Sequence, residues 1–141
     1  MQLVERDTAW AMSEENIEIM RQALEKWNRG GPDAVSELMD DDVVLRMAEG
    51  WPERVYFGKA AARSFFDGWA ETVGQEVVVE DLIDAGNAVV TRQRVHLSGV
   101  QSGIEGDQQS SSVWTLREGK VVMLEYFWDH QEALEAAGLS E

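Results

Sequence analysis

Two polar side chains that are able to move protons or hold an anion stand two residues apart in the sequence. Arg94 and His96 lie in the strand-like stretch 88–98, and alternate residues of a strand point to the same face of a sheet. An imidazole titrates near neutral pH, so His96 is a candidate general acid or base. The guanidinium of Arg94 suits a substrate carboxylate or an enolate oxygen. The pair therefore fits proton transfer beside a carbonyl group, a reaction that requires no cofactor.

A predicted hairpin supplies a third polar candidate. Two strand-like runs in 106–130 join at residues 117–119, whose final glycine fits a three-residue loop. This register places Tyr126 opposite Ser110, so that the tyrosine can donate to the same substrate oxygen as Arg94. The mixture on this face, aromatic and lightly polar, is typical of a small-molecule pocket. The face carries Gln108, Ser110, Ser112, Trp114, Tyr126, Trp128 and, at the strand exit, His130.

Each candidate also has a structural interpretation. A histidine in a strand is often a hydrogen-bonded structural residue, and aromatic side chains at strand spacing often form the core. Arg94 can instead belong to an ion-pair network with Glu76, Glu80 or Glu125. The residues therefore leave two classes open: an enzyme, or a non-catalytic module that binds a hydrophobic ligand or a partner protein.

Composition limits the classes of partner. The 141 residues include 12 Lys and Arg against 27 Asp and Glu, a net charge of −15, so nucleic acid and anionic membranes are not expected as partners. The absence of Cys excludes thiolate metal sites and disulfides, and no metal is expected. No apolar run approaches the ~20 residues of a membrane span, and the N-terminus lacks the pattern of a secretory signal. The cytoplasm is the expected location.

Helices and strands are grouped along the chain. Helical periodicity predicts a helix over 14–29, capped by Ser13 and preceded by an extension, residues 1–12. Helices grouped before a meander of strands predict an α+β fold, with the helices on one face of a curved, mostly antiparallel sheet. The other predicted helices are 32–39, 59–72 and 131–137, the predicted strands before the hairpin are 43–47, 55–57, 77–83 and 88–98, and Asp40 to Asp42 are expected in a solvated loop.

Several motifs resemble those of a known superfamily. They are Glu15-Asn16-Ile17 and Trp27-Asn28, Pro32-Asp33-Ala34-Val35, Asp41-Asp42-Val43-Val44, Tyr56-Phe57-Gly58-Lys59, the run 113–120 and Tyr126-Phe127-Trp128-Asp129. From about residue 13 to 139 the chain resembles the nuclear transport factor 2-like superfamily and, within it, the SnoaL-like polyketide cyclase group. The resemblance implies one domain over 13–141, with a cystatin-like cone of three N-terminal helices on a curved sheet around a central pocket. It also implies a homodimer through the outer face of the sheet.

The resemblance implies a pocket for a small apolar molecule, but this superfamily includes isomerases, cyclases, dehydratases, epoxide hydrolases and transport factors. If the protein is catalytic, a cofactor-independent isomerase, cyclase or dehydratase is expected, with His96, Arg94 and Tyr126 as catalytic residues. The epoxide hydrolases of this fold have an arginine and two acids at these three positions, and the loss of both acids argues against their mechanism. The residues expected to line the pocket are Trp27, Phe66, Trp69, Gln108, Ser110, Ser112, Trp114 and Trp128.

Overall fold

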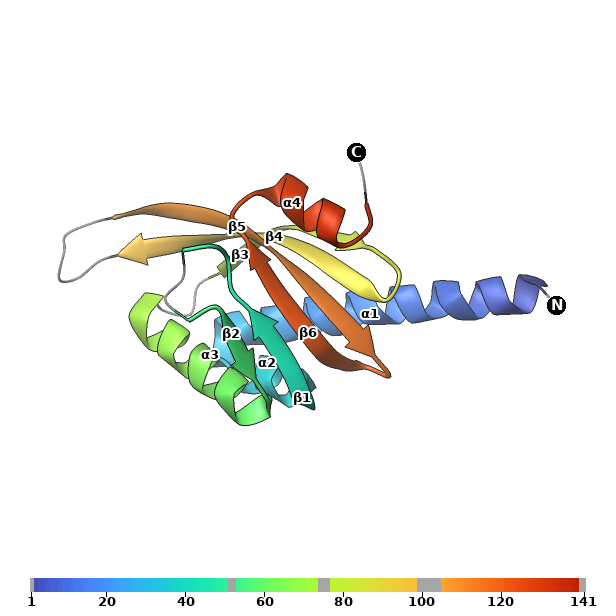
Figure 1. The fold of residues 1–141 in the computed structure, drawn as a ribbon, viewed down its shortest axis with the longest axis horizontal. Helices are drawn as coiled ribbons and strands as arrows, with labels where there is room; N and C mark the ends of the chain where they lie inside the picture. The colour runs from blue at the N-terminus through green and yellow to red at the C-terminus, as the bar shows by residue number, and fades with distance from the viewer. Residues whose placement is uncertain (1, 51–52, 74–76, 99–104, 140–141) are drawn as a thin grey trace.

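The computed structural model describes residues 2–50, 53–73, 77–98 and 105–139 (Figure 1). Within these ranges, the side chains of residues 2–13, 30, 70, 72–73, 95–98 and 105–107 lie outside the description. The fold is α+β, as predicted. The elements are α1 (Gln2–Gly30), α2 (Asp33–Leu38), β1 (Met39–Arg46), β2 (Val55–Phe57), α3 (Lys59–Val73), β3 (Val77–Asp84), β4 (Ala88–Ser98), β5 (Glu105–Arg117), β6 (Lys120–Phe127) and α4 (His130–Ala136).

The strands of the described ranges form one curved sheet of six, in the order β2-β1-β6-β5-β4-β3 (Figure 1). The last four strands are a sequential antiparallel meander, which confirms that prediction. Strand β1 joins the meander by pairing parallel to β6, and β2 then pairs antiparallel to β1. The sheet is therefore mixed at one edge, and the two halves of the chain meet along the β1–β6 ladder.

The two faces of the sheet carry separate clusters of apolar side chains. On the inner face, Trp27 of α1 and Phe66 of α3 pack with Leu45 and Leu124 in the main core. On the outer face, α4 packs over β4 and β5 through a smaller cluster, made by Ala88, Val90, Val113 and Ala133. Figure 1 shows α4 on the side of the sheet away from α2 and α3. The homodimer through the outer face stays a prediction, and α4 already covers part of that face.

The hairpin between β5 and β6 differs from its predicted register. Its loop has two residues, Glu118 and Gly119, both with positive φ (52° and 78°), the signature of a type I′ turn. The shorter loop shifts the pairing by one residue, and a bulge between Thr115 and Leu116 shifts it by another. Tyr126 consequently lies opposite Ser112, not Ser110. A shift of two residues keeps every side chain on its predicted face.

Two element boundaries also differ from the predictions. Helix α1 begins at Gln2 and runs through Ser13, so the predicted cap at Ser13 is wrong. The physical reason is that no glycine or proline precedes Gly30, so nothing in the sequence stops the helix earlier. The three aspartates Asp40 to Asp42 belong to β1 and not to a loop, because β1 already pairs with β6 at Met39, opposite Val121. The aspartates lie in the stretch between Met39 and Val44 where the register of this ladder shifts.

No helix in the described ranges combines the length and the apolar character that crossing a membrane requires.

Candidate ligand pocket

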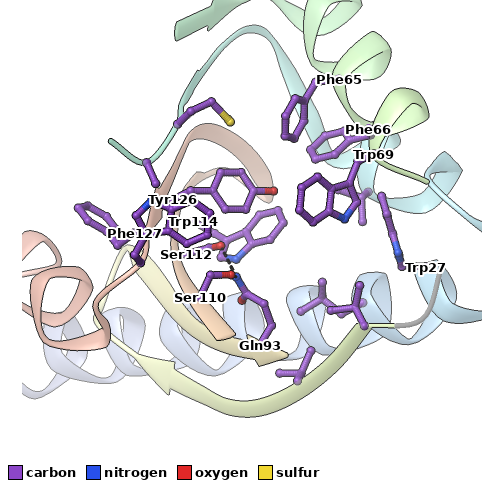
Figure 2. Close-up of a pocket in the computed structure, with 17 residues that line it drawn as sticks. Trp27, Phe65, Phe66, Trp69, Gln93, Ser110, Ser112, Trp114, Tyr126 and Phe127 are labelled. Atoms are coloured by element: carbon purple, nitrogen blue, oxygen red, sulfur yellow. Dashed lines mark hydrogen bonds between the residues drawn. The ribbon is translucent and has the colours of Figure 1, made fainter. Parts of the chain in front are cut away.

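A pocket lies between the inner face of the sheet and helices α1 and α3 (Figure 2). Its volume is about 80 Å³. This exceeds what one water molecule needs but is smaller than an engineered apolar cavity of about 150 Å³ that binds benzene. The side chains that line it are apolar or aromatic, with four uncharged polar exceptions, Gln93, Ser110, Ser112 and Tyr126. The described lining therefore suits a small, largely apolar molecule that carries few polar atoms.

The predicted lining residues all face this pocket except Gln108. Gln108 is exposed, and its side chain donates to the carbonyl of Gln109 at 3.1 Å, because β5 continues past the end of the pocket. Whether the residues that do face the pocket contact a ligand stays a prediction. Those residues are Trp27, Phe66, Trp69, Ser110, Ser112, Trp114 and Trp128.

The ring of Phe65 in α3 is the centre of the aromatic side of the pocket, although it was not among the predicted lining residues. Its centroid lies 5.6 Å from Phe66, 6.0 Å from Tyr126 and 6.2 Å from Trp69. Rings at these separations gain contact energy beyond area burial. Phe65 and Phe66 are consecutive in α3, and both line the pocket. The helical spacing of apolar residues in α3 was the signal that could have identified Phe65 as a lining residue.

A buried chain of hydrogen bonds crosses the sheet at the base of the pocket. The indole nitrogen of Trp114 donates to Thr91 Oγ1 at 3.0 Å, and Thr91 donates to Gln93 Oε1 at 2.8 Å. The amide nitrogen of Gln93 donates to Ser110 Oγ and to Ser112 Oγ, each at 2.9 Å (Figure 2). Gln93 is only 7% exposed, and its three hydrogen bonds offset the cost of burying an amide.

Gln93 was missed because the alternation of β4 was assigned one residue out of phase. Gln93 pairs with Ser110 and with Val79, both of which line the pocket, so odd-numbered residues of β4 face inward here. The available signal was the alternation of uncharged Thr91 and Gln93 with basic Arg92 and Arg94, which favours the uncharged face for the interior.

The position of Arg94 is corrected by the same alternation. Arg94 lies opposite Gln109, on the face of the sheet away from the pocket, with its Nε 3.9 Å from Glu80 Oε2. The structural alternative, an ion pair with Glu80, is therefore confirmed, and Arg92 shares the same carboxylate at 3.9 Å. The backbone of His96 pairs with Asp107, but its side chain lies outside the described part of the structure.

Tyr126 lies in the pocket, as predicted. Burial raises the pKa of its phenol well above the ordinary value of 10, so the hydroxyl remains neutral and able to donate. Figure 2 shows the hydroxyl pointing toward Trp69 across the pocket. Among the described residues the hydroxyl of Tyr126 makes no hydrogen bond.

Two residues that follow β6 make their hydrogen bonds away from the polar base of the pocket. Trp128 is 48% exposed, and its indole nitrogen donates to the carbonyl of Glu49 at 2.9 Å, which ties the exit of β6 to the loop after β1. His130 starts α4 and contacts Ser111 Oγ through Nδ1 at 2.7 Å, on the outer face. The described residues contain no group of three or more side chains suited to hold a metal ion.

Comparison with known proteins gives the family. The model of the SnoaL-like domain family matches residues 20–124. No curated protein matches the sequence. A solved structure assigned as a SnoaL-like polyketide cyclase from Jannaschia sp. CCS1 is 24% identical, with a TM-score of 0.68 over 81% of this chain and 85% of that one.

Two further solved structures share the fold. A nuclear transport factor 2-like protein of unknown function from Burkholderia pseudomallei K96243 is 18% identical, with a TM-score of 0.70 over 85% of this chain and 95% of that chain. TerC, co-crystallised with polyporic acid, is 20% identical, with a TM-score of 0.69 over 87% of this chain and 98% of that chain. At these identities the likeness shows the fold alone, whereas the family model covers most of the chain. The protein therefore belongs to the SnoaL-like domain family, and it shares its fold with a nuclear transport factor 2-like protein.

Proposed function

We propose that the protein binds a small, largely apolar molecule whose oxygen atom is held at the base of the pocket, beside Ser110. The observation that carries this proposal is the buried Gln93 amide, hydrogen-bonded to two serines inside an otherwise aromatic cavity. Burial of a primary amide among rings costs free energy that apolar residues of the same shape would avoid. A few convergent polar groups in an apolar concavity are what a ligand site requires.

The dimensions of the pocket limit the size of the ligand. A volume of about 80 Å³ admits one small ring only if side chains at the rim adjust. Trp128 is placed to do so, because it is half exposed and its hydrogen bond goes to a loop carbonyl. TerC, which has the same fold, was crystallised with polyporic acid, which supports a ligand site within this fold.

Titration with cyclopentanone tests the proposal, with tryptophan fluorescence as the readout, since four tryptophans line the pocket: Trp27, Trp69, Trp114 and Trp128. Val79 lines the pocket, whereas its neighbour Val78 is 43% exposed. We expect saturable quenching that Val79→Phe abolishes, by filling the cavity, and that Val78→Phe preserves. Equal quenching in both variants, or none in the wild type, would refute the proposal.

A second candidate is catalysis of proton transfer beside a carbonyl, as in an isomerase, cyclase or dehydratase. The neutral hydroxyl of Tyr126, which has no hydrogen-bond partner among the described residues, favours it, because this donor lies in the same pocket as the two serines and suits a developing enolate oxygen. No charged side chain is found among the described lining residues, so the base would have to come from elsewhere. His96 is the candidate in β4.

Exchange of the α-hydrogens of cyclopentanone with D₂O distinguishes catalysis from binding. In this step the base takes the α-proton, the C–H electron pair moves to give an enolate, and a solvent deuteron is then added at carbon. Catalysis predicts exchange above the buffer rate that falls in Tyr126→Phe and in His96→Ala. Binding alone predicts the buffer rate in all three proteins. Proton NMR measures the loss of the α-hydrogen signal.

A further inference from the structure

We infer that the pocket selects ligands by the direction of hydrogen bonding: the ligand atom held beside Ser110 and Ser112 is an acceptor, such as the oxygen of a ketone, an ester or a carboxylate. In this account Trp114, Thr91 and Gln93 are positioning residues that fix this direction from behind the site. The inference rests on the proposed function and adds to it the chemical class of the ligand.

The direction begins at Trp114. An indole nitrogen carries one hydrogen and has no lone pair to accept with, so it is always a donor. Thr91 Oγ1, 3.0 Å away, must therefore be the acceptor of that bond. The hydroxyl hydrogen of Thr91 is then directed to its other partner, Gln93 Oε1, at 2.8 Å. Both side chains of this step are buried, so water does not offer an alternative partner.

The hydrogen from Thr91 fixes the orientation of the Gln93 amide. Its carbonyl oxygen has to face Thr91, because a flipped amide would set N–H groups against the threonine hydrogen. The NH₂ group consequently faces the two serines, and it donates one hydrogen to each at 2.9 Å. The identity of Trp114 thus determines, through three consecutive hydrogen bonds, which atoms of Gln93 point toward the pocket.

Each serine is left with a hydrogen to donate. Ser110 and Ser112 accept from Gln93, and neither hydroxyl makes any other hydrogen bond within the described ranges. Ser110 is partly exposed, so a ligand reaches it first, and Ser112 lies fully buried behind it. Both oxygens are equidistant from one nitrogen, so one atom on the opposite side of the pair can likewise be close to both. A neutral Tyr126 adds a further donor and no competing charge.

The test compares two probes of the same shape. Cyclopentanone presents an acceptor oxygen, and methylenecyclopentane has a CH₂ group in its place. We expect Ser110→Ala/Ser112→Ala to lower the ratio of ketone to alkene affinity about tenfold, the effect of one or two neutral hydrogen bonds. The infrared band of ¹³C-labelled cyclopentanone should also move to higher frequency in this variant, since its carbonyl loses its donors. Ser110→Ala alone serves if the double variant does not fold.

Thr91 separates direction from mere contact, because it does not touch the ligand. Thr91→Val frees the amide of Gln93 to turn round, so the preference for the ketone should fall toward that of Ser110→Ala/Ser112→Ala. Thr91→Ser keeps the hydroxyl and should retain the preference. If both probes still bind, an unchanged affinity ratio and carbonyl band in Ser110→Ala/Ser112→Ala and in Thr91→Val would overturn the inference. If neither probe binds the wild type, the proposed function fails and the inference fails with it.

Discussion

Replacement of Gln93 by leucine removes the amide at the centre of the buried hydrogen-bond chain with little change in volume. The cavity term is therefore small, and the cost is set by the groups that the amide leaves behind. Thr91 keeps its bond from Trp114, but its hydroxyl hydrogen loses Gln93 Oε1, its acceptor among the described residues. Ser112 is fully buried and loses its donor, whereas Ser110 is partly exposed and can turn to water.

Two buried groups are thus stranded by the leucine. Each buried polar group left without a partner costs roughly 1–3 kcal/mol. Taking the low end for hydroxyls that can rotate, we expect Gln93→Leu to lower the free energy of unfolding by about 2 kcal/mol. The same change should abolish the preference for cyclopentanone over methylenecyclopentane, since the serines are no longer held in place.

Urea denaturation followed by circular dichroism measures the stability change, and Gln109→Leu is the matched control. Gln109 is a glutamine of the adjacent strand whose exposed side chain bonds Glu80 at 2.9 Å, so its loss should cost less than about 0.5 kcal/mol. The two variants should have equal m-values, which report a common unfolded state. Equal stability of the two variants, or a stabilised Gln93→Leu, would refute this account of the buried chain.

Three further changes test the packing, the turns and the buried phenol. Phe66→Ala should lower the free energy of unfolding, measured by urea denaturation, by about 3–5 kcal/mol, because the ring is 2% exposed and packs edge-on against Trp27 with a centroid distance of 5.9 Å. A loss below about 1 kcal/mol would mean that the aromatic side chains are loosely packed. Gly119→Ala should destabilise the protein by about 1 kcal/mol because its φ is +78°, whereas Gly68→Ala, in α3 with open space around it, should stabilise it by about 0.5–1 kcal/mol; thermal denaturation would contradict this if both shifted Tm in the same direction. Because the pKa of Tyr126 is raised, its phenol ionises only in the unfolded chain as the pH rises above about 10. The contribution of the neutral phenol to the free energy of unfolding is therefore complete below about pH 10 and decreases above it. Tyr126→Phe should reduce this decrease, and an identical pH dependence in both proteins would count against a buried neutral phenol.

The faces of the β5–β6 hairpin could be predicted because their alternation is insensitive to even shifts. The loop was one residue shorter than predicted and the bulge between Thr115 and Leu116 shifted the pairing by one more, so Ser112 and Tyr126 kept their common face although their partners changed. Helix periods placed Trp27 and Phe66 correctly for a related reason, since a stripe of apolar residues repeats over several turns. Both patterns, the alternation in the strands and the apolar stripe on the helices, repeat over many residues, so an error at one position does not change the prediction.

Strand β4 carried a signal that the prediction did not use. From Thr91 to Arg94 uncharged and basic residues alternate, which favours the face of Thr91 and Gln93, and not that of Arg94, for the interior. The chemistry of Arg94 drew attention to the outer face, where Glu80 supplies an ion pair. An uncharged glutamine carries no catalytic signal, and its role emerges only from the bonds to Thr91, Ser110 and Ser112 in three dimensions.

A crystal structure of the protein soaked with cyclopentanone tests the central claim most directly. The account predicts density for the ring between Trp69 and Tyr126, with the ketone oxygen about 2.7–3.0 Å from Ser110 Oγ and Gln93 still bonded to both serines. A pocket filled by its own side chains, or a probe bound with its oxygen away from the serines, would contradict it.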